Sequence, residues 1–143
     1  MLAVSKPAQA LHLAWTTFQR RQVSMADLAG FDCVFLPMPS GTKGRLGKAW
    51  QYARLFMQTL ALLRRRRPET VWFQLPQVPL MWAAMLYRLL FNSRARLVAD
   101  CHNAMFRPPW SRVPLGLSAL HRCDLVLVHN QAVLKAALDM GLP

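Results

Sequence analysis

Five short apolar segments, separated by helical or turn-rich stretches, constrain the fold of this chain most strongly. They begin near residues 11, 32, 70, 96 and 125, and read LHLAWT, DCVFL, TVWFQ, RLVAD and LVLV. Short, continuously apolar runs are typical of strands buried on both faces of a parallel sheet. Between them we expect helices at residues 25–29, 46–66, 78–91, 115–120 and 131–140. The alternation predicts an α/β fold: a Rossmann-like, doubly wound parallel sheet of about five strands with helices on both faces.

Length and cysteine content fit one domain that needs no covalent staple. The chain has 143 residues, 54% of them hydrophobic, and we treat residues 1–143 as a single domain. Its cysteines, Cys33, Cys101 and Cys123, are odd in number and form no CxxC pair. We therefore expect reduced, buried thiols rather than a disulfide framework or a zinc ribbon.

The charge is strongly positive, with 18 Lys and Arg against 6 Asp and Glu. Such a surface attracts nucleic acid, anionic lipid or phosphorylated small molecules, and composition does not choose among them. Residues 43–67 hold eight basic side chains and no acidic one. Their helix has a narrow polar stripe, and apolar residues including Trp50 cover the rest; it is either a core helix or a membrane-docking surface. The stripe consists of Gly47, Gln51, Arg54 and Gln58.

No segment is expected to cross a membrane. The most apolar run, 78–86, is followed by Arg88 and is shorter than the roughly 20 residues that a spanning helix needs. Lys6 precedes only a weak, proline-interrupted apolar stretch, so no cleaved signal is predicted. We expect a cytoplasmic protein that can associate peripherally with the inner face of the membrane.

Ligands of parallel α/β sheets bind beyond the carboxyl ends of the strands, so the loops there are the places to search. The first segment leads into Thr16, Thr17, Arg20 and Arg21 with no glycine nearby. A pyrophosphate-binding GxGxxG turn is excluded there, and no cofactor is predicted. The two arginines either bind a phosphate or form a solvated basic surface. In either case Ser24 is expected to cap the short helix that follows.

The fourth segment leads into the polar residues Asp100-Cys101-His102-Asn103. His102 can hydrogen-bond a sugar or phosphate and move a proton, with Asp100 orienting it and Asn103 beside it. The alternative is that this tetrad only caps a turn. After the fifth segment, His129 is assigned a structural role and Asn130 is expected to cap the last helix. No ligand cluster suggests a metal, and none is predicted.

From residue 71 onward the order of elements resembles a known family. The resemblance rests on a strand ending in a Gln-Pro-type turn, an apolar helix, a strand leading into His-Asn, and Arg122-Cys123-Asp124 before the fifth strand. Together they resemble the N-terminal half of a GT-B glycosyltransferase. The similarity is to bacterial family-four transferases and to the mannosyltransferases of lipid-linked oligosaccharide synthesis. Residues 15–39 fit the first two strands of that half.

This resemblance implies an acceptor-side domain. The family's N-terminal half holds a sugar or lipid-linked acceptor, its second half holds the nucleotide-sugar donor, and transfer takes place in the cleft between them. His102 corresponds to a histidine that lines this cleft, and Thr16–Arg21 to a loop that faces it. The donor-binding domain and its paired glutamates are missing, because Glu69 is the only glutamate of this chain. The expected activity therefore requires a donor-binding domain or subunit as partner.

Two other interpretations stay open at this stage. A basic nucleic-acid-binding domain fits the charge and the interleaved aromatics, but Trp50, Trp72, Phe73 and Trp82 lie in apolar runs that favour packing over base stacking. A truncated fragment without independent function fits the missing donor half.

Overall fold

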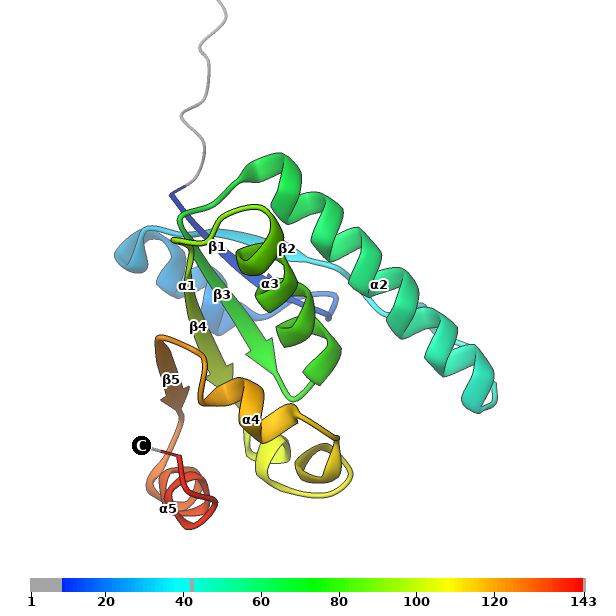
Figure 1. The fold of residues 1–143 in the computed structure, drawn as a ribbon, viewed down its shortest axis with the longest axis vertical. Helices are drawn as coiled ribbons and strands as arrows, with labels where there is room; N and C mark the ends of the chain where they lie inside the picture. Colours follow the sequence, from blue (N-terminus) through cyan, green and yellow to red (C-terminus); the bar gives the residue numbers. More distant parts are fainter. Residues whose placement is uncertain (1–8, 42, 143) are drawn as a thin grey trace, which may run out of the picture.

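Five strands form one sheet in which every neighbouring pair runs parallel, in the order β2-β1-β3-β4-β5 (Figure 1). The computed structural model describes residues 9–41 and 43–142, so the signal prediction around Lys6 lies outside the described residues. The strands are β1 Ala10–Ala14, β2 Asp32–Phe35, β3 Thr70–Leu75, β4 Arg96–Cys101 and β5 Leu125–Val128. The predicted parallel α/β fold is confirmed. The strand order extends to one side from β1 to β2 and to the other side from β3 to β5, so the topological switch point lies between β1 and β3.

Helices connect the strands close to the expected positions. They are α1 Arg20–Ala29, α2 Arg45–Arg66, α3 Val78–Leu90, α4 Gly116–Leu120 and α5 Gln131–Asp139, with 3₁₀ turns η1 Asn103–Phe106 and η2 Trp110–Arg112 after β4. One expectation was wrong: α1 starts at Arg20, so Ser24 lies inside the helix and does not cap it. The earlier start places Gln22 on the buried face of α1, where it contributes to the packing against the sheet.

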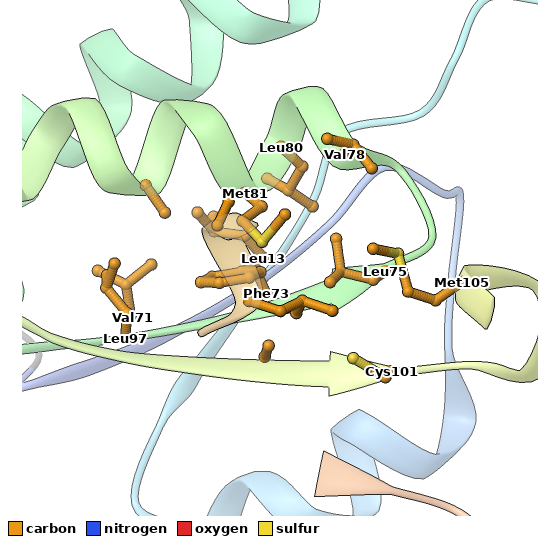
Figure 2. Packing of buried hydrophobic residues seen from close by; sticks show 14 of the residues in the cluster. Leu13, Val71, Phe73, Leu75, Val78, Leu80, Met81, Leu97, Cys101 and Met105 are labelled. Carbon is orange, nitrogen blue, oxygen red and sulfur yellow. The ribbon is translucent and has the colours of Figure 1, made fainter. Parts of the chain in front are cut away.

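The main hydrophobic core lies on one face of the sheet. Alternate strand residues point to this face, and Val78, Leu80 and Met81 of α3 pack against it (Figure 2). Leu55 and Leu63 of α2 belong to the same core. The fully buried strand members of this core are Leu11, Leu13, Val71, Phe73, Leu75, Leu97, Ala99 and Cys101. Trp15, just beyond β1, joins the same core and donates a hydrogen bond from Nε1 to Thr59 Oγ1 of α2 at 3.0 Å. The core therefore holds the residue that directly follows the carboxyl end of β1.

The opposite face of the sheet, toward α1, carries polar side chains at its carboxyl half. By the same alternation, His12, Trp72, Gln74 and Asp100 share this face, and Gln74 pairs with Asp100 across β3 and β4. Phe31, after α1, contacts the rings of both His12 and Trp72 at centroid distances of 5.1 and 5.3 Å. The aromatic rings of Phe31 and Trp72 thus lie beside the buried polar side chains of this face. Buried polar side chains are uncommon inside a sheet.

Helix α2 buries part of the stripe that the sequence marks as polar. Gln51 lies inside and donates from Nε2 to the Pro39 carbonyl at 3.1 Å, whereas Trp50 is 73% exposed. Because Trp50 is exposed, the expectation that it packs in an apolar interior was wrong. Leu46 and Met57 on the same helix are exposed as well. Nowhere in residues 9–41 and 43–142 does a helix combine the length and hydrophobicity that a bilayer crossing requires.

Candidate functional site

The carboxyl edge of the sheet brings together Arg21, Asp100, His102 and His129, which we call the edge cluster. The register of the β4–β5 pair explains the convergence, because Cys101 lies opposite Val128 and each strand is followed at once by a histidine. The imidazole centroids of His102 and His129 are 4.5 Å apart. Arg21 reaches the same place from the first turn of α1. Elements far apart in the sequence therefore build one polar site.

Asp100 is the centre of this cluster. Its carboxylate is almost fully buried, with 3% of the residue exposed. Gln22 Nε2 donates to Oδ2 at 3.1 Å, and His12 Nε2 lies 3.7 Å from the same oxygen. On the other side, His129 Nε2 lies 3.1 Å from Oδ1 and Arg21 NH2 lies 3.7 Å from it. One oxygen thus faces the interior, and the other faces the histidine and the arginine.

The surroundings favour the charged form of this buried carboxyl. Burial by itself raises the pKa of Asp100, but His12, Arg21, Gln22 and His129 outweigh that effect, and the pKa lies below its ordinary value. Asp100 is therefore a carboxylate at neutral pH. A buried negative charge of this kind attracts a cation or a hydrogen-bond donor to the carboxyl edge.

Both histidines of the cluster are biased toward the neutral form. Burial lowers the pKa of His102, with a further lowering from His129 and Arg21 that the Asp100 carboxylate only partly offsets. Burial is also the largest cause of the lowered pKa of His129, and Arg21 adds to it. The Arg21 NH1 group contacts both ring nitrogens of His129. Neutral imidazoles have a lone pair that can accept a proton or coordinate a metal ion.

The geometry also permits metal coordination. One ligand atom from each of Asp100, His102 and His129 lies within 4.8 Å of the other two. Two imidazole nitrogens and one carboxylate oxygen form a donor set that transition metals use. The sequence predicted no metal because these three residues are spread over two strands and no short spacing motif links them.

The structure brings together only some of the residues predicted for the site. Arg21, Asp100 and His102 share the cluster, whereas Thr16 is half-buried between β1 and α1, and Thr17, Arg20 and Asn103 are exposed. The expected pairing of Asp100 with His102 is replaced by a contact of Asp100 with His129. The histidine assigned a structural role is therefore the one that the carboxylate touches.

Sequence reasoning missed the inner partners of Asp100, namely His12 and Gln22. A signal existed for the first, because His12 is the one titratable residue in the apolar run LHLAWT and a buried strand seldom carries such a residue without a partner. Gln22 carried no such signal, because its stretch reads as a polar loop. By contrast, the prediction for Asn130 is confirmed: its side-chain oxygen accepts from Val133 N at 2.9 Å and caps α5.

Comparisons of the chain with protein-family models, with curated proteins and with solved structures return no match.

Proposed function

We propose that this chain is the acceptor-side half of a glycosyltransferase and that it acts with a donor-binding domain or subunit. Transfer would carry a sugar from a nucleotide-sugar donor to a membrane-associated or saccharide acceptor. The observation that carries the proposal is the edge cluster itself, where Arg21, Asp100, His102 and His129 meet at the carboxyl ends of β1, β4 and β5. In parallel α/β sheets this edge is where ligands bind.

Three members of the edge cluster, His102, Arg21 and Asp100, have a chemical role in this proposal. His102, half-buried beside the rim, is the catalytic candidate, because its imidazole can accept the proton of the hydroxyl that attacks the sugar. Arg21 is exposed and cationic, so it suits a phosphate or another anionic group of the acceptor. Asp100 holds Arg21 through its charge and contacts His129, which lies beside His102. Thr16 and Thr17 lie in the loop between β1 and α1, Arg20 begins α1 and Asn103 directly follows His102, so each can offer a polar contact to a sugar bound at this edge.

An apolar groove supports an acceptor that carries a lipid. It has a volume of about 460 Å³ and lies between the segment after β2 and the first half of α2. Leu36, Pro37, Pro39, Trp50 and Leu55 are among its lining residues. The groove lies against the segment that follows the carboxyl end of β2, the edge strand beside β1. A hydrocarbon chain would remove this apolar surface from water.

The exposed side of α2 supports the proposed association with the inner face of a membrane. Leu46, Trp50 and Met57 are exposed at positions that recur along one side of the helix. Eight basic and no acidic residues accompany them between positions 43 and 67. Apolar side chains framed by arginine and lysine favour the headgroup region of an anionic bilayer.

Ligand binding in solution tests the acceptor role. The ¹⁵N-labelled chain is titrated with short isoprenyl-pyrophosphate-linked sugars and with free oligosaccharides, and amide shifts are followed by NMR. We expect saturable shifts at residues 16–21, 100–103 and 129, reduced in His102→Ala and kept in His121→Ala, whose exposed imidazole lies outside the cluster. An absence of saturable shifts, or shifts confined to other surfaces, would overturn the acceptor role.

Transfer assays test the need for a partner. With nucleotide sugars and the same acceptors, we expect no turnover by this chain alone and turnover once a donor-binding half is co-expressed. Robust transfer by the isolated chain would contradict the two-part arrangement.

A further inference from the structure

Asp100, His102 and His129 place three metal-ligating side chains in one small volume. Their ligand atoms lie within 4.8 Å of one another, and the two imidazole centroids are 4.5 Å apart. Asp100 precedes the end of β4, and the two histidines directly follow β4 and β5, so the register of a buried sheet holds all three. A rigid scaffold of this kind keeps ligand atoms near the positions that coordinate an ion.

Two atoms of this group are buried without a hydrogen bond. Among the described residues, Asp100 Oδ1 and His102 Nε2 have no hydrogen bond, although Asp100 is only 3% exposed. Oδ1 faces His129 Nε2 at 3.1 Å and Arg21 NH2 at 3.7 Å, and buried atoms of His12, Gln22 and Gln74 are unpaired as well. Buried polar atoms are nearly always paired, because an unpaired one loses its hydration for nothing. Both atoms belong to the three-residue group and point to a bound cation as their missing partner.

The inner residues prepare the carboxylate for such an ion. Gln22 Nε2 donates to Asp100 Oδ2 at 3.1 Å, and His12 Nε2 lies 3.7 Å from that oxygen, whereas Oδ1 faces the histidines. Outer partners of this sort orient a ligating carboxylate and restrict it to one oxygen. The arrangement therefore presents a single oxygen to the volume that the two imidazoles share.

Arg21 is the cation that now lies against this group. Its NH2 is 3.7 Å from Asp100 Oδ1, and its NH1 contacts His129. The side chain is 44% exposed, so it can turn into solvent while the three ligand residues stay in place. A guanidinium and a metal ion compete for the same negative charge.

We propose that Asp100, His102 and His129 form a binding site for a divalent transition-metal ion of the zinc class, which displaces the guanidinium of Arg21. The metal site does not depend on the proposed glycosyltransferase function, but a bound metal would limit the role that His102 can have in that function. An imidazole nitrogen that coordinates a metal has no lone pair left for a proton. Bound metal and proton transfer by His102 would therefore exclude one another.

Calorimetric titration of the metal-free full chain with Zn²⁺, and the visible spectrum of the Co²⁺ complex, test this site. We expect one ion per chain, bound at least about tenfold more weakly by His102→Ala or by His129→Ala and more tightly by Arg21→Ala. The matched control is His121→Ala, which removes an exposed imidazole outside the group and should bind as the wild type does. Circular dichroism verifies that each variant is folded.

The decisive comparison uses the double variant His102→Ala/His129→Ala. Saturable binding by the wild type or by Arg21→Ala that the double variant loses supports the proposal. Equal binding by the wild type and the double variant, or no saturable binding by either the wild type or Arg21→Ala, overturns it. Neither result depends on sugar transfer, so failure of the metal site is distinguishable from failure of the acceptor role.

Discussion

At the scale of single residues, the buried carboxylate of Asp100 joins side chains from several elements. It collects contacts from β1, α1 and β5, with His12 and Gln22 inside and Arg21 and His129 outside. A charge taken out of water requires such partners. The cluster therefore also ties α1 and β5 to the centre of the sheet.

Gln22→Ala should destabilise the fold through this carboxylate. The variant loses the 3.1 Å hydrogen bond from Gln22 Nε2 to Asp100 Oδ2 and leaves a buried charge less well paired. We expect a decrease of about 2 kcal/mol in the free energy of unfolding, measured by urea denaturation. Ser24→Ala, an exposed change in the same helix, should stay within about 0.5 kcal/mol of the wild type. Equal stability of the two variants would show that this hydrogen bond contributes nothing.

The three thiols should differ in reactivity. Burial raises the pKa of Cys101 far above its ordinary value and that of Cys123 to about 12. The pKa of Cys33 is raised as well, by burial and by the neighbouring Asp32. Because the thiolate is the reactive form, alkylation of Cys33 by iodoacetamide should speed up as the pH rises toward its raised pKa.

Mass spectrometry after timed alkylation checks this order. Cys33 should be modified first, and Cys101 and Cys123 should be protected until the chain is unfolded by urea. Modification of Cys101 as fast as Cys33 in the native protein would contradict the described burial.

Individual site residues could be predicted only where the sequence pattern carried a chemical signal. Asp100 and His102 stood out because they follow an apolar strand, and Arg21 because of its position after the first strand. The contact of Asp100 with His129 depends on the β4–β5 register, which no local pattern specifies. Gln22 was hidden because α1 lacks a capping residue, with Gln19 at the N-cap making no side-chain hydrogen bond.

At the scale of elements, the strands and the long helices could be predicted from apolar runs. A strand buried in a parallel sheet has a continuously apolar sequence. The predicted strand 70–74 is observed as Thr70–Leu75, and the predicted helix 46–66 as Arg45–Arg66. The 3₁₀ turns after β4 could not be predicted from the sequence, because their residues have no periodic pattern. The orientation of α2 was also missed: an apolar surface that nearly surrounds the helix does not say which side faces the sheet.

The cap of α5 allows a quantitative test at this scale. Asn130→Ala removes the acceptor that satisfies Val133 N, and we expect a loss of about 1 kcal/mol in unfolding free energy. Asn130→Asp should retain most of the stability, since a carboxylate also caps a helix. Gln131→Ala, an exposed change one residue later, serves as the control. Thermal unfolding followed by circular dichroism measures all three, and equal midpoints for Asn130→Ala and the control would refute the cap.

At the scale of the whole molecule, charge and shape suggest how the chain meets its surroundings. The formal net charge is +12, and the helix with the densest basic flanks also exposes Trp50 at 73%. An isolated exposed apolar residue is ordinary, but Leu46, Trp50 and Met57 recur on one helix. These two properties are the basis of the proposed association with an anionic membrane surface.

Vesicle co-sedimentation tests the membrane association. We expect the chain to bind vesicles with anionic lipid, to bind neutral vesicles less, and to be released by salt because exposed charges are screened. Trp50→Ala should weaken binding several-fold, by about the free energy of burying one large side chain in part. Leu28→Ala is the matched control, since Leu28 is 92% exposed on α1. Equal weakening by both variants would show that α2 is not the docking surface.

The parallel sheet described above has a consequence for how a nascent chain matures. No two neighbouring strands are joined by a tight hairpin, and β1 finds its second neighbour only when Leu11 meets Val71. Until β3 has been synthesised, β1 can pair only with β2, and its other side has no partner strand. Non-local pairing of this kind slows folding and exposes sticky edges. The central strand β1 is therefore expected to complete its pairing only after the segment up to residue 75 has been synthesised.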